Sequence, residues 1–381
     1  GCRLFQEVLV PRYNHILNMR RPNEKVNLMS HKAMLFFEYV GNNIQTLELI
    51  RNILSTYPNV KYFLVIDDCY EGLIDDRVLE ELDKITREND NIDKIKILSS
   101  NKNLETKVST LFKSEMVFQY FNIHSYMSAY DHVSPDEHVH RVNPELREKK
   151  FLCVNRQERV HRIMTVDFLS RNDILKHSHT SCLLGDYAPL LYNDTEFTMQ
   201  NPNLEKYQDP ALKKIRLSND SKDRLRKTLP LELDIKEHQL KSFAVNMPDL
   251  GKYFDQSYFS IVTEGDFNSS TQKKQYTEKI LKCFLYHHPF VVLGLPGTLE
   301  LLREEGFITF SSFLDEKNDD KRMNMVFSQI KKLNELNMHQ FKNMYEDMLP
   351  ILEHNYRHCL NRYRTDQPGN LVNEILDWYY L

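Results

Sequence analysis

The stretch Ser257-Tyr-Phe-Ser-Ile-Val-Thr-Glu264 is an apolar run of strand length that ends on a carboxylate. After a polar segment, Thr277-Glu-Lys279 opens an amphipathic helix that is predicted to extend to Tyr286. A second apolar run, Phe290 to Leu293, then leads into a turn at Gly294 and a further helix. Strand, helix and strand in this order predict parallel strands joined by crossover helices.

The same alternation extends over most of the chain. Strands are expected at 33–39, 60–66, 95–99, 150–155, 181–184 and 308–310, and helices at 46–57, 77–89, 160–170, 299–305, 321–363 with an interruption at Pro350, and 371–381. Residues 130–144 contain three His and two Pro, have no period and are expected to form a linker. The fold class predicted is therefore α/β, with two Rossmann-like domains at 1–145 and 146–345 and C-terminal helices at 346–381.

The composition narrows the class of protein. Of the 381 residues, 41% are apolar and 27% charged, as in water-soluble globular proteins. The formal net charge of −4 argues against a protein that holds nucleic acid by charge alone. The six cysteines are widely spaced with no C-x-x-C pair, so no structural zinc site is expected. The same spacing favours a protein of a reducing compartment. With no secretory signal and no run near 18 apolar residues, a cytoplasmic protein without a membrane segment is expected.

A basic turn follows the strand that ends at Asn155. Five Lys or Arg and one Glu share the fourteen positions from Lys149 to Arg162, and Arg156, Arg159, His161 and Arg162 lie in the turn after the strand and at the start of the next helix. Guanidinium groups and the free amides of a helix N-terminus both suit a phosphate group. The alternative is a solvated basic turn whose arginines form surface ion pairs.

The helix start at Thr277 carries a second anion signal. Thr277 is a suitable N-cap, so Glu278 and Lys279 fall in the first helical turn. Glu278 suits the helix dipole, whereas Lys279 opposes it and is better explained by an anionic ligand. A carboxylate at such a turn can also accept hydrogen bonds from two ribose hydroxyls. The adjacent His287 and His288 lack a carboxylate at ligand spacing, so no metal site is expected.

These segments taken in order resemble the donor-binding half of GT-B glycosyltransferases. The resemblance covers roughly residues 148–325 and rests on the ordered set 155–162, 260–264, 277–279, 289–299 and 306–310. This ordered set of segments is most similar to the fucosyltransferase and exostosin-like families of bacteria, phages and large DNA viruses. It implies a GT-B-like fold in which two Rossmann-like domains face a cleft, and in which the C-terminal helices return to the first domain.

The resemblance also implies a function. It implies a metal-independent, inverting enzyme without a cofactor, which transfers a sugar from a nucleotide-diphosphate donor to a hydroxyl of a glycan or of a modified DNA base. By similarity Arg156 or Arg162 would neutralise the diphosphate with Lys279, Glu278 would bind ribose, and Glu264 would face the sugar or ribose. Asn155, Thr277 and Gly294 complete the donor-binding set. No obligatory protein partner is expected, and the location would be the cytoplasm, that of the host if the protein is viral.

An inverting transfer needs a base that takes the proton of the acceptor hydroxyl. Three carboxylates of the first domain follow predicted strands: Glu38 after the first, and Asp67 and Asp68 after the second. They are the candidates for the catalytic base, and the alternative for each is helix capping or a solvated turn. For the whole chain, the competing hypothesis is a catalytically inactive module of the same fold that binds a glycan or a nucleotide.

Overall fold

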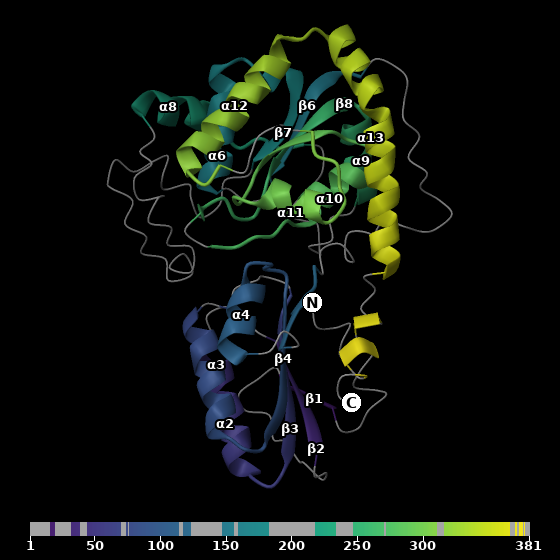
Figure 1. Cartoon of the computed structure of the whole chain (residues 1–381). Helices are drawn as coiled ribbons and strands as arrows, with labels where there is room; N and C mark the ends of the chain where they lie inside the picture. Colours follow the sequence, from purple (N-terminus) through teal and green to yellow (C-terminus); the bar gives the residue numbers. More distant parts are fainter. Residues whose placement is uncertain are drawn as a thin grey trace. The chain divides into compact units, whose positions relative to one another are not determined.

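The structure is a computed structural model of the chain. It describes residues 16–19, 32–38, 44–69, 74, 76–113, 117–122, 147–155, 159–182, 218–233, 247–269, 272–310 and 316–365, with 370, 371, 373–375 and 377. The chain divides into two compact units, and each is built on a parallel sheet with helices (Figure 1). Unit 1 comprises Gly1–Tyr126, Lys273–Gln275 and Arg362–Leu381, and unit 2 comprises Met127–Gln272 and Tyr276–Asn361.

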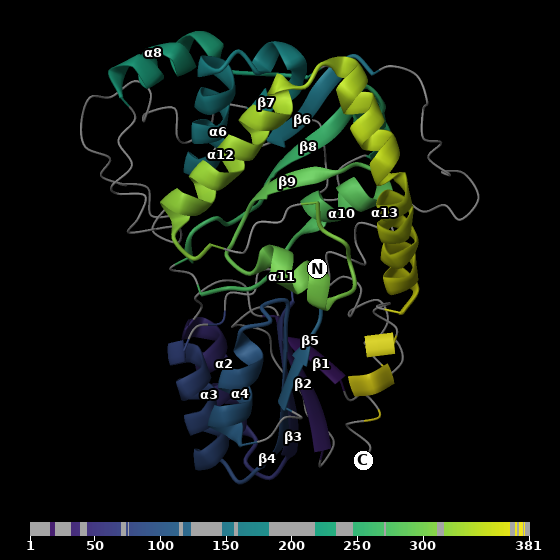
Figure 2. The ribbon, with the colours of Figure 1, turned by 45° about the horizontal axis from the view of Figure 1, so that its top comes forward.

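Unit 1 contains a five-stranded sheet in the order β1-β2-β3-β4-β5, in which all neighbouring strands are parallel. The strands are β1 (Ile16–Met19), β2 (Lys32–Glu38), β3 (Lys61–Asp68), β4 (Ile92–Ser99) and β5 (Phe118–Tyr120), and the helices are α2 (Ile44–Thr56), α3 (Asp76–Glu88) and α4 (Leu104–Phe112). From β2 to β5 the sheet grows in one direction, so right-handed crossovers place α2, α3 and α4 on the same face (Figure 2). The apolar side chains of this face form one core with the three helices.

The chain end from Arg362 belongs to unit 1. Its described helical residues include Leu371 and Ile375, which are 3% and 0% exposed. The Nε2 atom of Gln119, in β5, donates to a carboxylate oxygen of Glu374 at 2.5 Å. The polar contact to β5 therefore attaches this segment to unit 1, and its two apolar side chains are buried.

Unit 2 contains a four-stranded parallel sheet in the order β7-β6-β8-β9. The strands are β6 (Lys149–Asn155), β7 (Ser178–Cys182), β8 (Ser257–Thr263) and β9 (Phe290–Leu293), and the helices are α6 (Val160–Arg171), η2 (Leu175–His177), α8 (Asn219–Thr228), α9 (Met247–Asp255), α10 (Glu278–Leu285), α11 (Thr298–Glu304), α12 (Asp319–Glu335) and α13 (Met338–Thr365). The chain passes from β6 through α6 to β7 on one side, whereas β8 lies on the other side of β6 and leads through α10 to β9. The order of strands therefore reverses between β6 and β8, the place where open α/β sheets bind ligands.

Two apolar layers enclose this sheet. On one face, Cys153, Ile261 and Leu293 pack with α6, α12 and the first half of α13. On the other face, Val262 and Val292 pack with α9, α10 and α11. Strands covered on both faces explain why β8 is buried along its whole length and reads as a continuous apolar run.

The predicted α/β class with parallel sheets is confirmed, and two expected elements are wrong. Residues 308–310 form no strand, because the backbone N–H and C=O of Ile308 bond to the side chain of Asn355 in α13, both at 2.8 Å. The helical tail is interrupted at 336–337 rather than at Pro350, which lies inside α13. Asn337 and Gln340 exchange side-chain to backbone hydrogen bonds of 3.0 and 2.8 Å, a capping box that starts the second helix.

Within the described residues, no helix has the length and apolar character needed to cross a membrane.

Candidate functional site

The carboxyl ends of β6 and β8 meet at the reversal point of the unit 2 sheet. Asn155 ends β6 and Thr263 ends β8, and both are buried. The hydroxyl of Thr263 donates to Oδ1 of Asn155, and the backbone N–H of Asn155 donates to Oγ of Ser181 at 3.1 Å. Asn155 therefore holds the ends of three neighbouring strands together.

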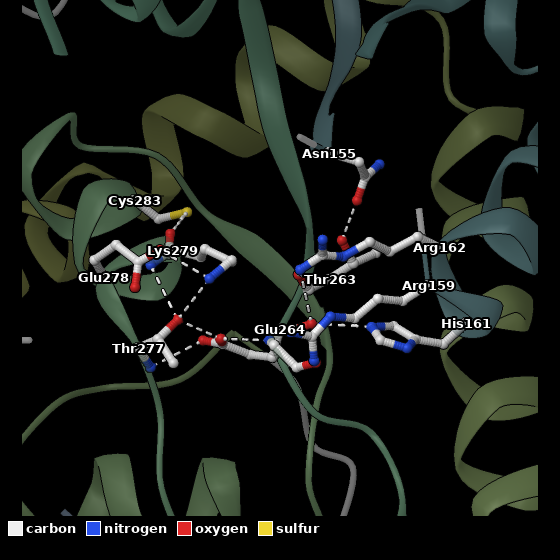
Figure 3. A network of polar contacts seen from close by, with 11 residues as sticks. Asn155, Arg159, His161, Arg162, Thr263, Glu264, Thr277, Glu278, Lys279 and Cys283 are labelled. Carbon is white, nitrogen blue, oxygen red and sulfur yellow. Dashed lines mark hydrogen bonds and ion pairs between the residues drawn. The ribbon is translucent and has the colours of Figure 1, made fainter. Parts of the chain in front are cut away.

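The start of α6 places basic side chains beside the residues that follow β8 (Figure 3). His161 donates from Nε2 to the carbonyl of Glu264 at 2.9 Å, and Arg162 donates from Nη2 to the same carbonyl at 3.2 Å. Arg159 donates to the carbonyl of Gly265 and forms an ion pair of 3.2 Å with Asp266. These contacts fix two guanidinium groups at the carboxyl edge of the sheet.

Burial changes the titration of this basic group. It lowers the pKa of His161 to about 3, and the charge of Arg162 acts in the same direction, so the imidazole is neutral at physiological pH. Burial also lowers the pKa of Arg162 to about 10, with Arg159 adding to the effect and Glu264 opposing it. Arg162 is thus a charged group held at 5% exposure, a state that favours a neighbouring anion.

The carboxylate of Glu264 connects the end of β8 to the start of α10. Its Oε1 accepts a hydrogen bond of 3.1 Å from the backbone N–H of Thr277, and its Oε2 accepts from the Thr277 hydroxyl and from the backbone N–H of Gly265. Thr277 is the N-cap of α10, as predicted, and its hydroxyl accepts from the N–H of Lys279. Figure 3 shows Glu264 between the α6 residues and the α10 residues.

The first turn of α10 carries the second charged group. The Nζ of Lys279 donates to Oε1 of Glu278 at 2.8 Å and to the Thr277 hydroxyl at 3.2 Å. The side chains of Lys279 and Glu278 are 29% and 22% exposed, so both remain accessible to a ligand. The N-terminal end of the helix dipole adds partial positive charge at the same place.

Gly294 follows β9 and lies against this carboxylate. A Cβ atom at Gly294 would stand 3.3 Å from Cγ of Glu264, which is tighter than ordinary contact, and would touch Oγ1 of Thr298 at 3.4 Å. Its carbonyl accepts a hydrogen bond of 3.0 Å from Nε of the buried Arg322 in α12. The absence of a side chain at Gly294 therefore allows Glu264 to occupy its position.

One buried residue of this region is missing from the sequence-based site. Lys282, one turn into α10, is 7% exposed. Burial lowers its pKa to about 8, while the carboxylates of Glu278 and Glu264 oppose the shift and Lys279 adds to it. The sequence contains one sign of this burial, because Lys282 interrupts the run 280–285, in which every other residue is apolar and suits a buried helix face.

The structure brings most of the predicted donor-binding residues together in unit 2. They are Asn155, Arg162, Glu264, Thr277, Glu278, Lys279 and Gly294. Arg156 lies outside the described residues.

The three candidate bases lie in unit 1 at the carboxyl ends of β2 and β3, where Glu38 and Asp67 are partners in the strand register. The side chains of Glu38 and Asp67 lie outside the described part of the structure, whereas the side chain of Asp68 is described. Asp68 is 1% exposed and accepts hydrogen bonds from the Ser99 hydroxyl at 2.8 Å and the Ile74 N–H at 3.3 Å. Asp68 therefore has a structural role that connects β3 to β4 and to the segment that follows β3.

In the described ranges, no group of three or more His, Cys, Asp or Glu side chains could hold a metal ion. A scan of protein-family models and a search of curated proteins each found no match to this chain.

Proposed function

We propose that unit 2 binds the nucleoside diphosphate of a nucleotide sugar and that the chain is a glycosyltransferase of the GT-B type. The observation that carries the proposal is the grouping of Arg162, Glu264 and the Lys279 turn of α10 at the strand-order reversal. A diphosphate is stabilised by cations and by the positive end of a helix dipole, and a ribose by a carboxylate that accepts from its hydroxyls. All three are contributed by residues within this group.

In the proposed reaction, the acceptor hydroxyl attacks the anomeric carbon of the sugar and the bond from that carbon to the diphosphate breaks. Lys279 and Arg162 stabilise the negative charge that develops on the leaving diphosphate, which is the electrostatic contribution to catalysis. A carboxylate of unit 1, with Asp67, Asp68 and Glu38 as candidates, takes the proton of the acceptor hydroxyl. The acceptor is a glycan or a modified DNA base, and the formal net charge of −4 favours a glycan.

A donor panel tests the proposal. The 381-residue chain is mixed with GDP, UDP, ADP and dTDP sugars, and thermal stabilisation and release of free nucleoside diphosphate are measured. Mass action predicts that a specific donor stabilises the protein. Stabilisation without release of diphosphate, with or without glycan acceptors, would support the inactive binding module instead. The absence of stabilisation by every donor would overturn the proposal.

The proposed site uses basic side chains where other transferases use a metal ion. Donor binding and turnover should therefore be unchanged by EDTA. Loss of turnover in EDTA, with recovery on addition of Mn²⁺, would contradict this part of the proposal.

A further inference from the structure

Lys282 is the most unusual charged residue of α10. Lys282 is only 7% exposed. The neighbouring residues of the helix are also buried, namely Ile280, Leu281, Cys283, Phe284 and Leu285. The backbone carbonyl of Lys282 accepts a hydrogen bond of 3.0 Å from the Tyr286 N–H, but among the described residues no hydrogen bond or ion pair of its side-chain ammonium is recorded. Burial of most of a lysine side chain without a recorded ion pair is costly for its charge, so its presence calls for an explanation outside the packing of the helix.

The position of Lys282 in the helix supplies that explanation, because it follows Glu278 by four residues and Lys279 by three, so the three residues share one face of α10. Long side chains of a helix point back toward its N-terminus, and the N-terminus of α10 carries Thr277, Glu278 and Lys279. The charges that act on Lys282 are Glu278, Lys279 and Cys283 of its own helix and Glu264 at the end of β8. Lys282 therefore lies within the electrostatic reach of the residues that make up the proposed diphosphate site.

We propose that Lys282 is a second lysine of the anion site and that its ammonium contacts the diphosphate of the bound nucleotide beside Lys279. This inference rests on the proposed function. The bound diphosphate supplies the direct anionic partner that no described residue is recorded to give the Lys282 ammonium in the free protein. In the free protein, Lys282 remains a buried group that costs stability, as is common for residues kept for binding.

Proton linkage makes the inference measurable. In the free protein the pKa of Lys282 is lowered by burial to about 8, so at pH 9 the amine is mostly neutral. A bound diphosphate favours the ammonium form, so binding at pH 9 takes up about one proton. Binding that takes up a proton becomes weaker as the proton concentration falls, so the affinity for a nucleoside diphosphate decreases as the pH rises above about 8.

The experiment uses the full chain with GDP, UDP, ADP and dTDP, followed by the best binder of the four. Calorimetric titrations at pH 9 in two buffers of different ionisation enthalpy give the dissociation constant and the protons taken up. The variants are Lys282→Met, which removes the charge at similar volume, and Lys282→Arg, which retains it. Lys332→Met, at an exposed position of α12, is the matched control.

Lys282→Met should raise the dissociation constant about 10- to 100-fold, the value of a hydrogen bond to a charged group, and should abolish proton uptake. Lys282→Arg should retain most of the affinity without proton uptake at pH 9, because arginine stays protonated. Lys332→Met should match the wild type in both quantities. If Lys282→Met does not fold, proton uptake by the wild type and its absence in Lys282→Arg decide the question.

Two negative results are distinguishable. If the wild type binds none of the four diphosphates, the proposed function fails and this inference fails with it. If the wild type binds one of them but Lys282→Met binds equally well with the same proton uptake, only the role of Lys282 is overturned.

A measurement without ligand provides a further check. The folded-state pKa of Lys282 lies below its unfolded value, so the unfolded chain binds more protons between pH 8 and 10.5 and the stability of the wild type rises with pH in this window. Lys282→Met should unfold at a higher temperature than the wild type at pH 7, and the difference should shrink toward pH 10.5. A variant less stable than the wild type at pH 7 would show that Lys282 is structural.

Discussion

The backbone N–H of Thr277 donates to Oε1 of Glu264 at 3.1 Å, and the Thr277 hydroxyl donates to Oε2 of the same carboxylate. This pair joins the first residue after β8 to the N-cap of α10, although thirteen positions separate them in the chain. The position of the α10 N-terminus, and with it that of Lys279, therefore depends on one buried carboxylate. Glu264 has a structural reason to be an acid in addition to the ligand role expected from the resemblance.

The first prediction concerns Glu264→Gln. The carboxylate accepts hydrogen bonds through both oxygens, whereas the amide has one oxygen and one NH₂ group. The NH₂ group would therefore face an N–H or O–H donor of Thr277 or Gly265 and could not accept its hydrogen bond. We expect a loss of about 1–3 kcal/mol in the free energy of unfolding, the cost of an unsatisfied buried group. Denaturant unfolding measures it, with Asp347→Asn at an exposed position of α13 as the control. Unchanged stability in Glu264→Gln would show that these hydrogen bonds do not support the fold.

Gly294→Ala should disturb the same carboxylate from the opposite side. The new methyl group would stand 3.3 Å from Cγ of Glu264, and overpacking of this kind costs about 1–3 kcal/mol. Gly265→Ala is a matched control, because its Cβ would meet only Arg159 Nη1 at 4.0 Å. We expect weaker nucleotide binding and a lower melting temperature for Gly294→Ala alone. Equal behaviour of the two variants would argue against a tight fit at Gly294.

Lys279→Ala tests the accessible lysine of the proposed site. We expect donor binding to weaken by about 1.5–3 kcal/mol, the value of a hydrogen bond to a charged group. The melting temperature should change little, because the ion pair of Lys279 with Glu278 is partly exposed and such pairs contribute little stability. Calorimetric titration and thermal unfolding of the same preparation measure both quantities. A variant that unfolds easily but binds donor normally when folded would make Lys279 structural.

Much of the fold could be predicted because buried parallel strands appear in the sequence as continuous apolar runs, as at Phe290–Leu293. The strands β1 and β5 could not, since four and three residues are too short to show a pattern. The run at 308–310 was misleading because a distant asparagine, Asn355, binds the backbone that a strand would use. The break before α13 was readable, because Asn337 and Gln340 have the spacing of a capping box.

The candidate site was predictable to the extent that its residues follow strand ends. Asn155 and Glu264 could be expected to lie close together because the carboxyl ends of parallel neighbours share one edge. The bond from Glu264 to Thr277 spans a polar segment without a period, so no sequence rule gives it. The burial of Lys282 likewise depends on how α10 is covered, which is a tertiary property.

Amide substitutions separate the three candidate bases. Asp68→Asn should lower the stability of unit 1 by about 1–3 kcal/mol, because the buried carboxylate accepts from Ser99 and Ile74. The true base, once replaced by its amide, should reduce turnover about 10²- to 10⁴-fold with donor affinity nearly unchanged. We therefore expect Asp67→Asn or Glu38→Gln to show loss of turnover without loss of stability. Near wild-type turnover in all three variants would place the base elsewhere or indicate a retaining reaction.

The last prediction concerns the chain end. Truncation after Gly369 removes Leu371 and Ile375, which are buried in unit 1, and the Glu374 carboxylate that accepts from Gln119. Burial of an aliphatic side chain contributes about 1.5–3 kcal/mol, so the loss of two is a large part of the roughly 5–15 kcal/mol that holds a domain folded.

We expect the melting transition of unit 1 to fall and transfer activity to be lost, whereas unit 2 still binds a nucleoside diphosphate because its site residues are untouched. Differential scanning calorimetry with and without nucleotide separates the two units, since only the transition of unit 2 should rise with ligand. Asp377→Ala, at an exposed position of the same segment, should behave as wild type. Full activity and an unchanged melting curve after truncation would mean that the segment contributes nothing to unit 1.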